Sequence, residues 1–399
     1  MSDLFKDLKV VDAASFLAGP CAATILSDYG ADVVKVEPLT GDRHRSIAAG
    51  HPADWSWQLT GRNKRSLAMD ITTPQGYATL MRMLEQADVF LVNFSAANLT
   101  KYGLTWDELK ARNPRLIFAQ ITAYGLQGPD AERRAFDITG FFCRSGIVDF
   151  AHDKGGMPSP PAGGVGDHTT AMTLFGGIMM ALYKRDRTGE GSMVTTSLAA
   201  TGTWANGLNL QATMAGVDGP RRRDAEGWSN PISNIYETRD NRFIMLGVQN
   251  AKRDWPTLAR ALKHPEWLEG EITRDIKVVF KNRFAVKEIV ASAFKEMDAA
   301  EISARLDECG IVHALVAQTT EVIDDEQLIA NGVIVPSDSG IEGVERTFAT
   351  PFNLSDETQV RPQRAPEVGE NSRSILDEFG FSGAEVDDLL NAGVIKQAD

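Results

Sequence analysis

The sequence LKVVDAASFLAGPCAATILSDYGADVVKVE occupies residues 8–37 and alternates two kinds of local pattern. Residues 8–13 and 32–37 are short runs rich in β-branched residues, which is typical of buried strands. Residues 20–29 between them have the apolar spacing of a helix that ends before Gly30. A strand, a helix and a second strand in this order predict a parallel sheet covered by helices.

The same alternation continues through the N-terminal half of the chain. Further strands are expected at residues 65–70, 89–93, 116–121 and 193–198, and helices at 74–86, 106–112 and 170–183. This order predicts an α/β fold with a doubly wound, Rossmann-like sheet. Ligands are expected near the carboxyl ends of its strands.

The pattern changes after residue 215, and residues 216–329 are expected to form a smaller α+β domain. Residues 216–231 look like a loop. The pattern then predicts a hairpin at 235–238 and 243–248, helices at 255–262, 286–297 and 299–309, and a strand at 312–316. A pair of helices is expected between residues 372 and 392.

Composition limits the possible classes of protein. The chain has 399 residues, of which 43% are hydrophobic and 24% charged, as in a soluble enzyme of two or three domains. No apolar run approaches the ~20 residues of a membrane helix, and no signal peptide is seen, so we expect a cytoplasmic protein without a membrane partner. The net charge of −13 argues against nucleic-acid binding.

Cysteine and histidine residues are too scattered to predict a disulfide framework or a metal site. The three cysteines are Cys21, Cys143 and Cys309, and they form no Cys-x-x-Cys motif. No metal is therefore expected.

The most distinctive local motif is GGVGDH at residues 163–168, which places Asp167 behind three glycines and just ahead of the helix expected at 170–183. One interpretation is an ordinary helix N-cap. The other is a nucleophilic carboxylate that the helix dipole keeps ionised and that is lightly covered. The motif alone leaves both open.

Several separated motifs, taken together, resemble the class III, formyl-CoA-transferase-like family, and the resemblance extends over nearly the whole chain. The matching motifs are VD at 11–12, LAGP at 17–20, GADVVKVEP at 30–38, NKRS at 63–66, NF at 93–94, AYGLQGP at 123–129, GD at 166–167, TGEG at 188–191, AP at 365–366 and GE at 369–370.

This resemblance implies a large α/β domain built from residues 1–215 and 330–399, with the smaller domain inserted between them. It also implies an intertwined homodimer and an active site between the domains. The implied reaction moves coenzyme A from an acyl-CoA thioester to a small free carboxylic acid through mixed anhydrides and a covalent aspartyl-CoA intermediate. Asp167 would be the catalytic residue, and coenzyme A would be a co-substrate rather than a permanently bound cofactor.

The same resemblance implies a set of coenzyme A contacts. They are Phe16, Met69, Thr72, Asn93, Phe94, Lys101, Tyr102 and Arg134. Lys101 and Arg134 would pair with phosphates. Met69 is also interpretable as a core residue, because it alternates along a strand, and Lys101 as a solvated one.

Three further residues are candidates for the acyl site. Asp137 matches a carboxylate near the catalytic aspartate, although it is also interpretable as the cap of a helix starting at Ile138. Gly166 belongs to the Gly-Asp motif, and the glycine-rich loop offers backbone N–H groups to a developing oxyanion. Leu17 stands where formyl-CoA transferases have Gln, which argues for a larger or more apolar acyl group. Gln249 is a possible substitute donor.

Alternative functions are weighed on the same residues. An α-methylacyl-CoA racemase needs a His and an Asp, but the matching segment 135–137 has Phe136 in the His position. An intramolecular CoA transferase remains possible. A dinucleotide-dependent oxidoreductase is disfavoured because no Gly-x-Gly-x-x-Gly follows the first strand. A non-catalytic CoA-binding protein is possible in principle.

Overall fold

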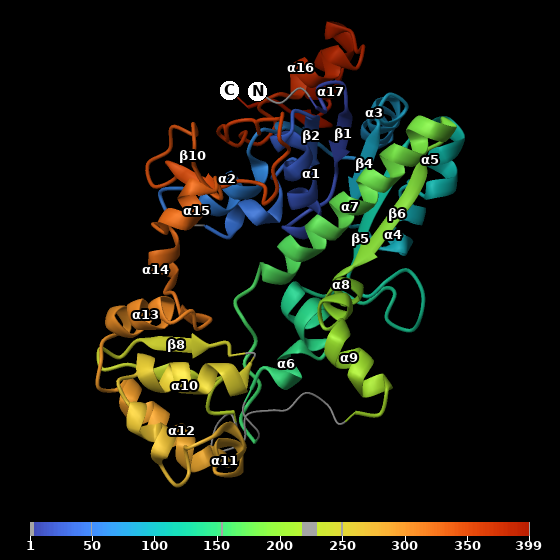
Figure 1. Cartoon of the computed structure of the whole chain (residues 1–399). Helices are drawn as coiled ribbons and strands as arrows, with labels where there is room; N and C mark the ends of the chain where they lie inside the picture. Colours follow the sequence, from blue (N-terminus) through green and yellow to red (C-terminus); the bar gives the residue numbers. More distant parts are fainter. Residues whose placement is uncertain (1–3, 49, 153–154, 218–229, 249, 399) are drawn as a thin grey trace. The chain divides into compact units, whose positions relative to one another are not determined.

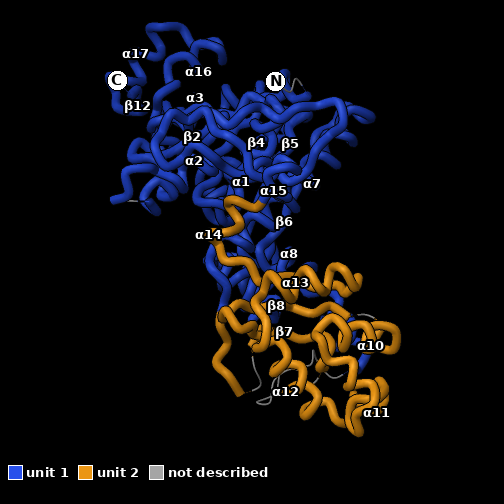
Figure 2. Tube along the Cα trace, turned by 60° about the vertical axis from the view of Figure 1, so that its left-hand side comes forward, with its two compact units in different colours: residues 1–148, 160–217, 326–399 blue, residues 149–159, 218–325 orange. Residues whose placement is uncertain are grey.

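The computed structural model describes residues 4–48, 50–152, 155–217, 230–248 and 250–398. The chain forms two compact units (Figure 2). Unit 1 comprises residues 1–148, 160–217 and 326–399, and unit 2 comprises residues 149–159 and 218–325. The domain limits expected from the sequence stay a prediction.

Unit 1 is built on a large, mostly parallel sheet (Figure 1). Over the described residues, the sheet has seven strands in the order β12-β3-β2-β1-β4-β5-β6. The strands are β1 (Lys9–Asp12), β2 (Asp32–Glu37), β3 (Arg65–Met69), β4 (Val89–Val92), β5 (Ile117–Thr122), β6 (Ser192–Ser197) and β12 (Ile395–Lys396). The predicted α/β class is confirmed, with the correction that the sheet is mixed because β12 runs antiparallel to β3.

Strand alternation explains why helices cover both faces of this sheet. Val11 belongs to a core with residues of the helices at Pro74–Leu84, Trp106–Arg112, Ser372–Glu378 and Gly383–Asn391. Its neighbour Val10 belongs to a core with residues of the helices at Ala18–Asp28 and Val165–Thr188. The helices of unit 1 are α1 (Ala18–Asp28), α2 (Trp55–Gly61), α3 (Pro74–Leu84), α4 (Ala96–Lys101), α5 (Trp106–Arg112), α7 (Val165–Thr188), α8 (Leu198–Ala205), α9 (Gly207–Met214), α15 (Glu326–Ala330), α16 (Ser372–Glu378) and α17 (Gly383–Asn391).

Shorter elements complete this unit and its boundary with unit 2. They are a 3-10 turn at Arg43–Ser46, a π-helical turn at Ile138–Cys143, the short helix α6 (Ile147–Phe150), and the antiparallel pair β10 (Ile334–Pro336) and β11 (Arg346–Phe348).

The strand order has a switch point between β1 and β4, where ligands are expected in such sheets. β1 pairs with β2 on one side and β4 on the other, and the connection after β1 leads to β2 whereas the connection after β4 leads the opposite way to β5. In doubly wound sheets such a switch point opens a crevice at the carboxyl ends of the strands. The loops after Asp12 and Val92 lie at this edge.

Residues near the C-terminus complete unit 1. The Pro366 carbonyl accepts a 3.0 Å hydrogen bond from Trp57 Nε1, and Ile395 pairs with Met69 across the β12–β3 ladder. Unit 1 therefore contains segments from both halves of the described chain.

Unit 2 has a small antiparallel sheet with helices. Its strands are β7 (Ile235–Glu237), β8 (Phe243–Leu246) and β9 (His313–Leu315), and its helices are α10 (Ala251–Ala261), α11 (Ile276–Lys281), α12 (Arg283–Phe294), α13 (Ala299–Glu308) and α14 (Thr319–Val322), with a 3-10 turn at Pro265–Glu269. Its core surrounds Tyr236, Trp255 and Phe294. The expected hairpin and short strand are present. The predicted loop at 216–231 falls mostly outside the described residues.

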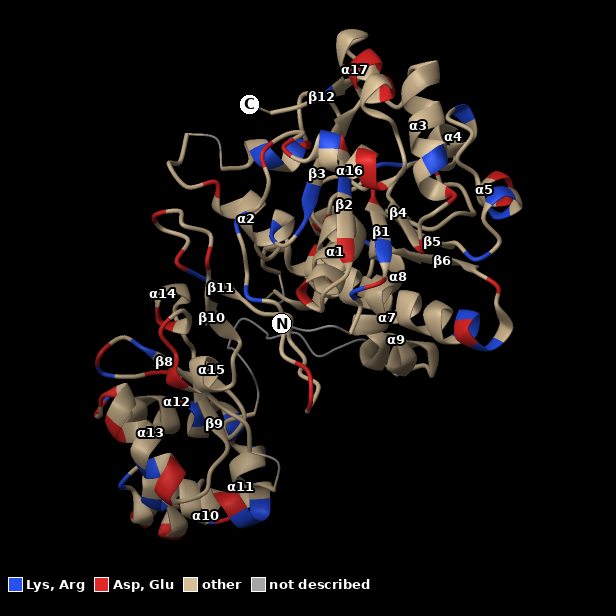
Figure 3. Cartoon of the chain, turned by 90° about the horizontal axis from the view of Figure 1, so that it is seen from above, with Lys and Arg blue, Asp and Glu red and all other residues tan. Residues whose placement is uncertain are grey.

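Basic and acidic side chains are interspersed over the elements of both units, for example on α5 and α10 (Figure 3). Among the helices that the structure describes, none is both long enough and apolar enough to cross a membrane.

Candidate active site

Asp167 lies in the first turn of α7, which begins at Val165. The sequence placed the helix start at residue 170 with Asp167 ahead of it, and this expectation is wrong. Gly164 precedes the helix with a φ of 98°, a backbone conformation that other residues rarely adopt, so the chain turns into the helix earlier. Asp167 is therefore a first-turn residue and not the cap.

The Asp137 side chain fixes the start of α7. Its Oδ2 accepts hydrogen bonds from the backbone N–H of Gly164 (2.7 Å) and Gly166 (3.1 Å), and its Oδ1 accepts one from Ile138 (2.8 Å). Asp137 is buried. Two of the free N–H groups at the α7 N-terminus thus find their acceptor in a different segment.

Sterics explain why position 166 is a glycine. A Cβ atom there would lie 2.7 Å from Phe141 Cβ and 2.9 Å from Asp137 Cβ. Real Cβ atoms do not approach other atoms so closely, so any side chain would push Asp137 away from the loop. Gly166 therefore allows the loop and the π-helical turn that follows Asp137 to pack directly.

The electrostatic state of Asp167 differs from the sequence expectation of a lightly covered, fully ionised group. Its side chain is half-buried, and none of the described residues donates a hydrogen bond to its carboxylate. Burial, and then the negative charge of Asp137, raise the pKa of Asp167 to about 7. The group is therefore divided between its neutral and ionised forms near neutral pH.

Leu17 lies beside Gly164, and Phe16 precedes it in the chain. A Cβ at Gly164 would be 3.3 Å from Leu17 Cδ2. Phe16 has a φ of 69°, which costs on the order of 1–3 kcal/mol for a residue with a side chain. The Phe16 ring centroid is 5.5 Å from that of Phe136 and 6.2 Å from that of His44.

Asn93 connects the loops at the switch point. Its Nδ2 donates to the Ser15 carbonyl (2.9 Å), and its Oδ1 accepts from the Ser15 N–H (3.0 Å). Asn93 directly follows β4, and Ser15 belongs to the loop after β1. The two carboxyl-terminal loops are therefore held together by a pair of hydrogen bonds.

Phe94, Lys101 and Tyr102 gather next to Asn93. The rings of Phe94 and Tyr102 meet edge to face at 6.1 Å, and Lys101 Nζ lies 5.2 Å from the Tyr102 ring centroid. Both aromatic side chains are half-buried, and Lys101 is exposed. Part of the expected coenzyme A set thus shares one surface.

The remaining members of that set are in different surroundings. Met69 is only 2% exposed and belongs to the sheet core. This placement agrees with the interpretation of Met69 as a core residue. Thr72 is exposed and hydrogen-bonds Asp70 through its hydroxyl at 2.6 Å. Arg134 is exposed, and no ion pair joins it to the described part of the chain.

A buried ion-pair network lies below the loop after β1 and was not predicted from the sequence. Asp42 is 4% exposed, and its Oδ2 lies 2.9 Å from Lys35 Nζ. Burial alone would raise the pKa of Asp42, but Lys35 and the N–H donors His44 and Phe16 hold it below its ordinary value. The Lys35 ammonium also donates to the Ala14 carbonyl.

Lys64, from the NKRS motif, completes this network on the other side. Its Nζ donates to Asp12 Oδ2 (3.0 Å) and to the Pro20 carbonyl (2.7 Å), and the side chains of Asp12 and Lys64 are fully buried. Only a parallel sheet that sets β1, β2 and β3 side by side brings these groups together. Strand order, which a local pattern does not reveal, was the missing information.

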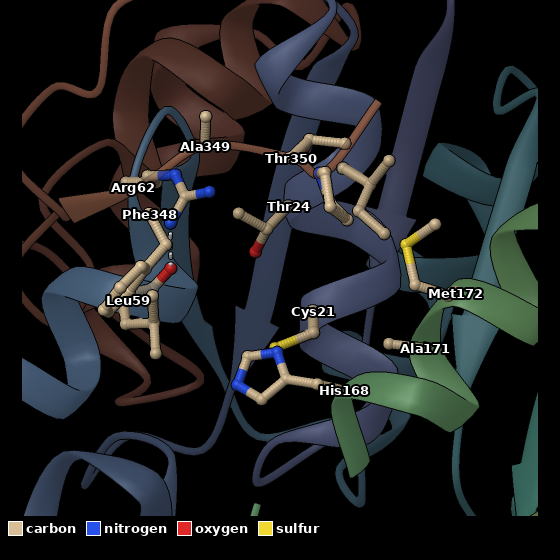
Figure 4. Close-up of a pocket in the computed structure, with 12 residues that line it drawn as sticks. Cys21, Thr24, Leu59, Arg62, His168, Ala171, Met172, Phe348, Ala349 and Thr350 are labelled. Atoms are coloured by element: carbon tan, nitrogen blue, oxygen red, sulfur yellow. Dashed lines mark hydrogen bonds between the residues drawn. The ribbon is translucent and has the colours of Figure 1, made fainter. Parts of the chain in front are cut away.

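A separate cavity of about 120 Å³ lies within unit 1, next to the side of α7 that carries His168 (Figure 4). Its lining residues are Cys21, Thr24, Ile25, Leu59, Arg62, His168, Ala171, Met172, Phe348, Ala349, Thr350 and Pro351. Burial raises the pKa of the Cys21 thiol to about 12. Cys21 therefore stays protonated at neutral pH and offers no competing nucleophile.

Two other expectations concern metal ligands and a hydrogen-bond donor that would replace the glutamine of formyl-CoA transferases. Within the described residues, no three His, Cys, Asp or Glu side chains are grouped as metal ligands. Gln249, the possible substitute for the missing glutamine, lies outside the described residues.

Comparison with known proteins gives a family match over most of the chain. CoA-transferase family III matches residues 5–372. The (R)-2-hydroxy-4-methylpentanoate CoA-transferase of Clostridioides difficile is 29% identical over 98% of this chain and 100% of its own length. The cinnamoyl-CoA:phenyllactate CoA-transferase of Clostridium sporogenes is 28% identical over 97% of this chain and 96% of its own.

A solved structure agrees with these sequence matches. The crystal structure of a CAIB/BAIF family protein from Brucella suis superimposes on this fold with a TM-score of 0.84 and 27% identity. It covers 95% of this chain and 99% of its own.

Proposed function

This chain belongs to CoA-transferase family III and is a class III CoA-transferase that moves coenzyme A between an acyl-CoA and a carboxylic acid, and we propose that Asp167 is its covalent nucleophile. The observation that carries this proposal is the position of Asp167: a half-buried carboxylate at the start of α7, with a pKa of about 7, beside the buried Asp137. Such a group supplies a useful fraction of ionised nucleophile at neutral pH.

The first half-reaction consists of two exchanges. An ionised oxygen of Asp167 attacks the thioester carbonyl carbon, the C–S bond breaks, and coenzyme A leaves as a thiolate from a mixed anhydride. The thiolate then attacks the Asp167 side-chain carbonyl carbon, and the donor acid leaves as its carboxylate. The enzyme now carries coenzyme A as an aspartyl thioester.

The acceptor acid reverses both steps. Its carboxylate attacks the aspartyl thioester, releases the thiolate and forms a second mixed anhydride. The thiolate attacks the acceptor carbonyl of that anhydride, which yields the new acyl-CoA and restores Asp167. No water or outside reductant enters, and the overall exchange of one acyl-CoA thioester for another is close to isoenergetic, although each mixed anhydride lies higher in energy than the thioesters. Positioning of the reacting groups is therefore a main demand on the enzyme.

The backbone N–H groups of the glycine-rich loop were expected to stabilise the oxyanion, but not all of them are free to do so. The N–H groups of Gly164 and Gly166 are occupied by Asp137. The N–H groups of Val165 and Asp167 have no acceptor in the part of the chain that the structure describes. We therefore assign the donor role to Val165 and Asp167, aided by the α7 dipole.

Coenzyme A is proposed to bind along the carboxyl edge of the sheet as a co-substrate. Asn93 holds the crevice loops, while Phe94 and Tyr102 offer an aromatic surface, and Lys101 and Arg134 are the exposed cations for its phosphates.

The acid substrate is proposed to carry an apolar side chain. Leu17 lies next to Gly164, so the acyl group on Asp167 would meet a hydrocarbon surface where formyl-CoA transferases have an amide. The two relatives named above bear the names of branched and aromatic hydroxy acids, which supports the same class.

A homodimer, intertwined as the family resemblance implies, is also part of the proposal. Trp204, Leu208 and Met214 are 88%, 86% and 74% exposed on α8 and α9. Large apolar side chains so exposed are unusual on a monomer surface and are typical of an interface. Light scattering after gel filtration measures the mass, and a monomeric mass would exclude the dimer. The cytoplasmic location stays a prediction.

Trapping the intermediate tests the nucleophile. The protein is incubated with a panel of acyl-CoAs and carboxylates, and exchange products are followed by mass spectrometry. Borohydride or hydroxylamine added during turnover should modify Asp167 specifically. Asp167→Ala should lose turnover and keep coenzyme A affinity, whereas Asp186→Ala, an exposed carboxylate on the same helix, should keep both.

Two experimental outcomes would contradict the proposed function. Normal exchange by Asp167→Ala would contradict the covalent mechanism. Exchange of the substrate α-proton with deuterated water, in the absence of any acceptor acid, would indicate a racemase.

A further inference from the structure

Asp42 joins the loop after β1 to the network below it. Its Oδ1 accepts hydrogen bonds from the N–H of Phe16 (3.1 Å) and of His44 (2.9 Å), while its Oδ2 pairs with Lys35. Its own N–H donates to Glu37 Oε2 at 2.8 Å. The Asp42 carboxylate is therefore held on both sides and has little freedom to move.

Phe16 needs such support because its backbone is in the left-handed region, with a φ of 69°. The residue is not a glycine, and it is followed directly by Leu17 and the start of α1. Its ring contacts His44, whose N–H is bound by the same Asp42 oxygen, and Phe136, which precedes Asp137. Contacts thus run from Asp42 through Phe16 to Phe136, the neighbour of Asp137, while Leu17, the residue after Phe16, lies next to Gly164 at the start of α7.

We propose that Asp42 is a positioning residue of the active site: its carboxylate holds Phe16 in the left-handed conformation and thereby fixes Phe16 and Leu17 beside the loop that carries Asp167. This inference rests on the proposed function for the use of that loop. Asp42 itself touches neither the loop nor the reacting atoms. It acts through the backbone of residue 16.

A second role for Asp42, neutralising Lys35, makes a different prediction. The two oxygens have separate partners: Oδ1 faces the Phe16 and His44 amides, and Oδ2 faces the Lys35 ammonium. If only charge neutralisation mattered, the conformation of residue 16 would not influence the effect of removing Asp42. A glycine at position 16 separates the two roles because it adopts a positive φ without support.

The experiment is a double-mutant cycle of Asp42→Ala and Phe16→Gly, with kcat and KM measured separately for the acyl-CoA and the acceptor acid. Asp42→Ala should lower kcat/KM for acyl-CoA on the order of tenfold in the wild-type background, and less than about threefold with Phe16→Gly. Asp42→Asn, which keeps an oxygen for the two amides, should recover part of the loss. Equal fold-losses in both backgrounds would overturn the proposal.

Hydrogen–deuterium exchange gives a readout independent of turnover and of variant yield. Peptides covering residues 14–18 and 162–168 should exchange faster in Asp42→Ala, and by a smaller factor in Asp42→Asn, which keeps an acceptor oxygen. The matched control is Asp28→Asn, which alters another buried carboxylate, bound to Arg62 and Thr350. It should leave both peptides unchanged. Unchanged exchange in the Asp42 variants would overturn the proposal.

Failure of the proposed function would look different. A wild-type chain that turns over acyl-CoA without acylating Asp167 contradicts the covalent mechanism alone. The coupling between positions 16 and 42 is measured from whatever CoA turnover the chain shows. The test of the positioning role of Asp42 is therefore independent of the test of the covalent mechanism.

Discussion

The Asp137 carboxylate accepts a 3.1 Å hydrogen bond from the backbone N–H of Gly166, the residue immediately before Asp167. One buried side chain therefore has two effects on the proposed nucleophile. It fixes the backbone of the loop, and its negative charge contributes to the raised pKa of Asp167. Structural support and electrostatic tuning come from the same group.

The acylation rate should depend on pH through Asp167. Because its pKa is raised to about 7, the carboxyl group is mostly protonated below that pH, and only the ionised form attacks. We expect the single-turnover rate of donor-acid release to fall about tenfold per pH unit below 7 and to level off above it. Rapid-quench measurement of the released donor acid gives this profile, and a rate that stays flat down to pH ~5 would disagree with it.

Replacing Asp137 should separate its two effects. Asp137→Asn removes the negative charge but keeps one oxygen acceptor, so the pKa of Asp167 should fall and the pH profile should move to lower pH. Asp137→Ala also leaves Gly164 and Gly166 without their acceptor, and kcat should fall on the order of a hundredfold. The pH–rate profiles of both variants are the measurement. An unshifted profile for Asp137→Asn would mean that burial alone sets the pKa.

Gly166→Ala should disrupt the site by sterics. Its Cβ would meet Phe141 and Asp137, so we expect a loss of roughly 1–3 kcal/mol in unfolding free energy and loss of most turnover. Gly176→Ala, on the same helix, meets nothing within 4 Å and should stabilise by up to about 1 kcal/mol. Urea unfolding at fixed protein concentration compares the two. Similar effects from both substitutions would contradict the steric explanation.

Lys64→Met should destabilise the whole of unit 1. It leaves the buried Asp12 carboxylate without its 3.0 Å partner, and breaking one side of a buried pair costs about 3–5 kcal/mol. The exposed Lys6→Met should change the unfolding free energy by less than about 0.5 kcal/mol. Thermal and urea unfolding provide the values. A Lys64→Met protein as stable as wild type would show that the pair is dispensable.

Leu17→Gln should change the choice of acid. An amide beside Gly164 would desolvate poorly against an apolar side chain and would hydrogen-bond a small polar acyl group. We expect kcat/KM for acids with apolar side chains to fall on the order of tenfold relative to that for small polar acids such as oxalate. Competition between paired acids measures this ratio directly. An unchanged ratio would place the acid away from Leu17.

Strands were predictable where both faces are buried. The run Val89–Val92 is buried throughout, and its limits were predicted to within one residue. Helix α9 was not predicted, and the structure shows why: none of its residues is buried. A helix without a buried face has no regular spacing of apolar residues by which it could be recognised in the sequence. That spacing arises because one face of a helix packs against the core.

The sequence predicts the candidate site as a set of residues and not as an arrangement. Asp167 and Asp137 both belong to that predicted set, but their connection through the backbone amides of Gly164 and Gly166 depends on a fold between distant segments. Asp42 was overlooked for the same reason. Nothing in the segment around residue 42 indicates that its carboxylate supports a strained backbone at Phe16.

The pairing of β12 with β3 has a consequence for biosynthesis. The β3 edge at Met69 and Ala68 remains open until Ile395 and Lys396 have left the ribosome, long after the strand itself has emerged. An open, apolar strand edge is a template for pairing with another chain. We therefore expect nascent chains to need shielding by a chaperone during this interval, and polypeptides released early to aggregate through β3.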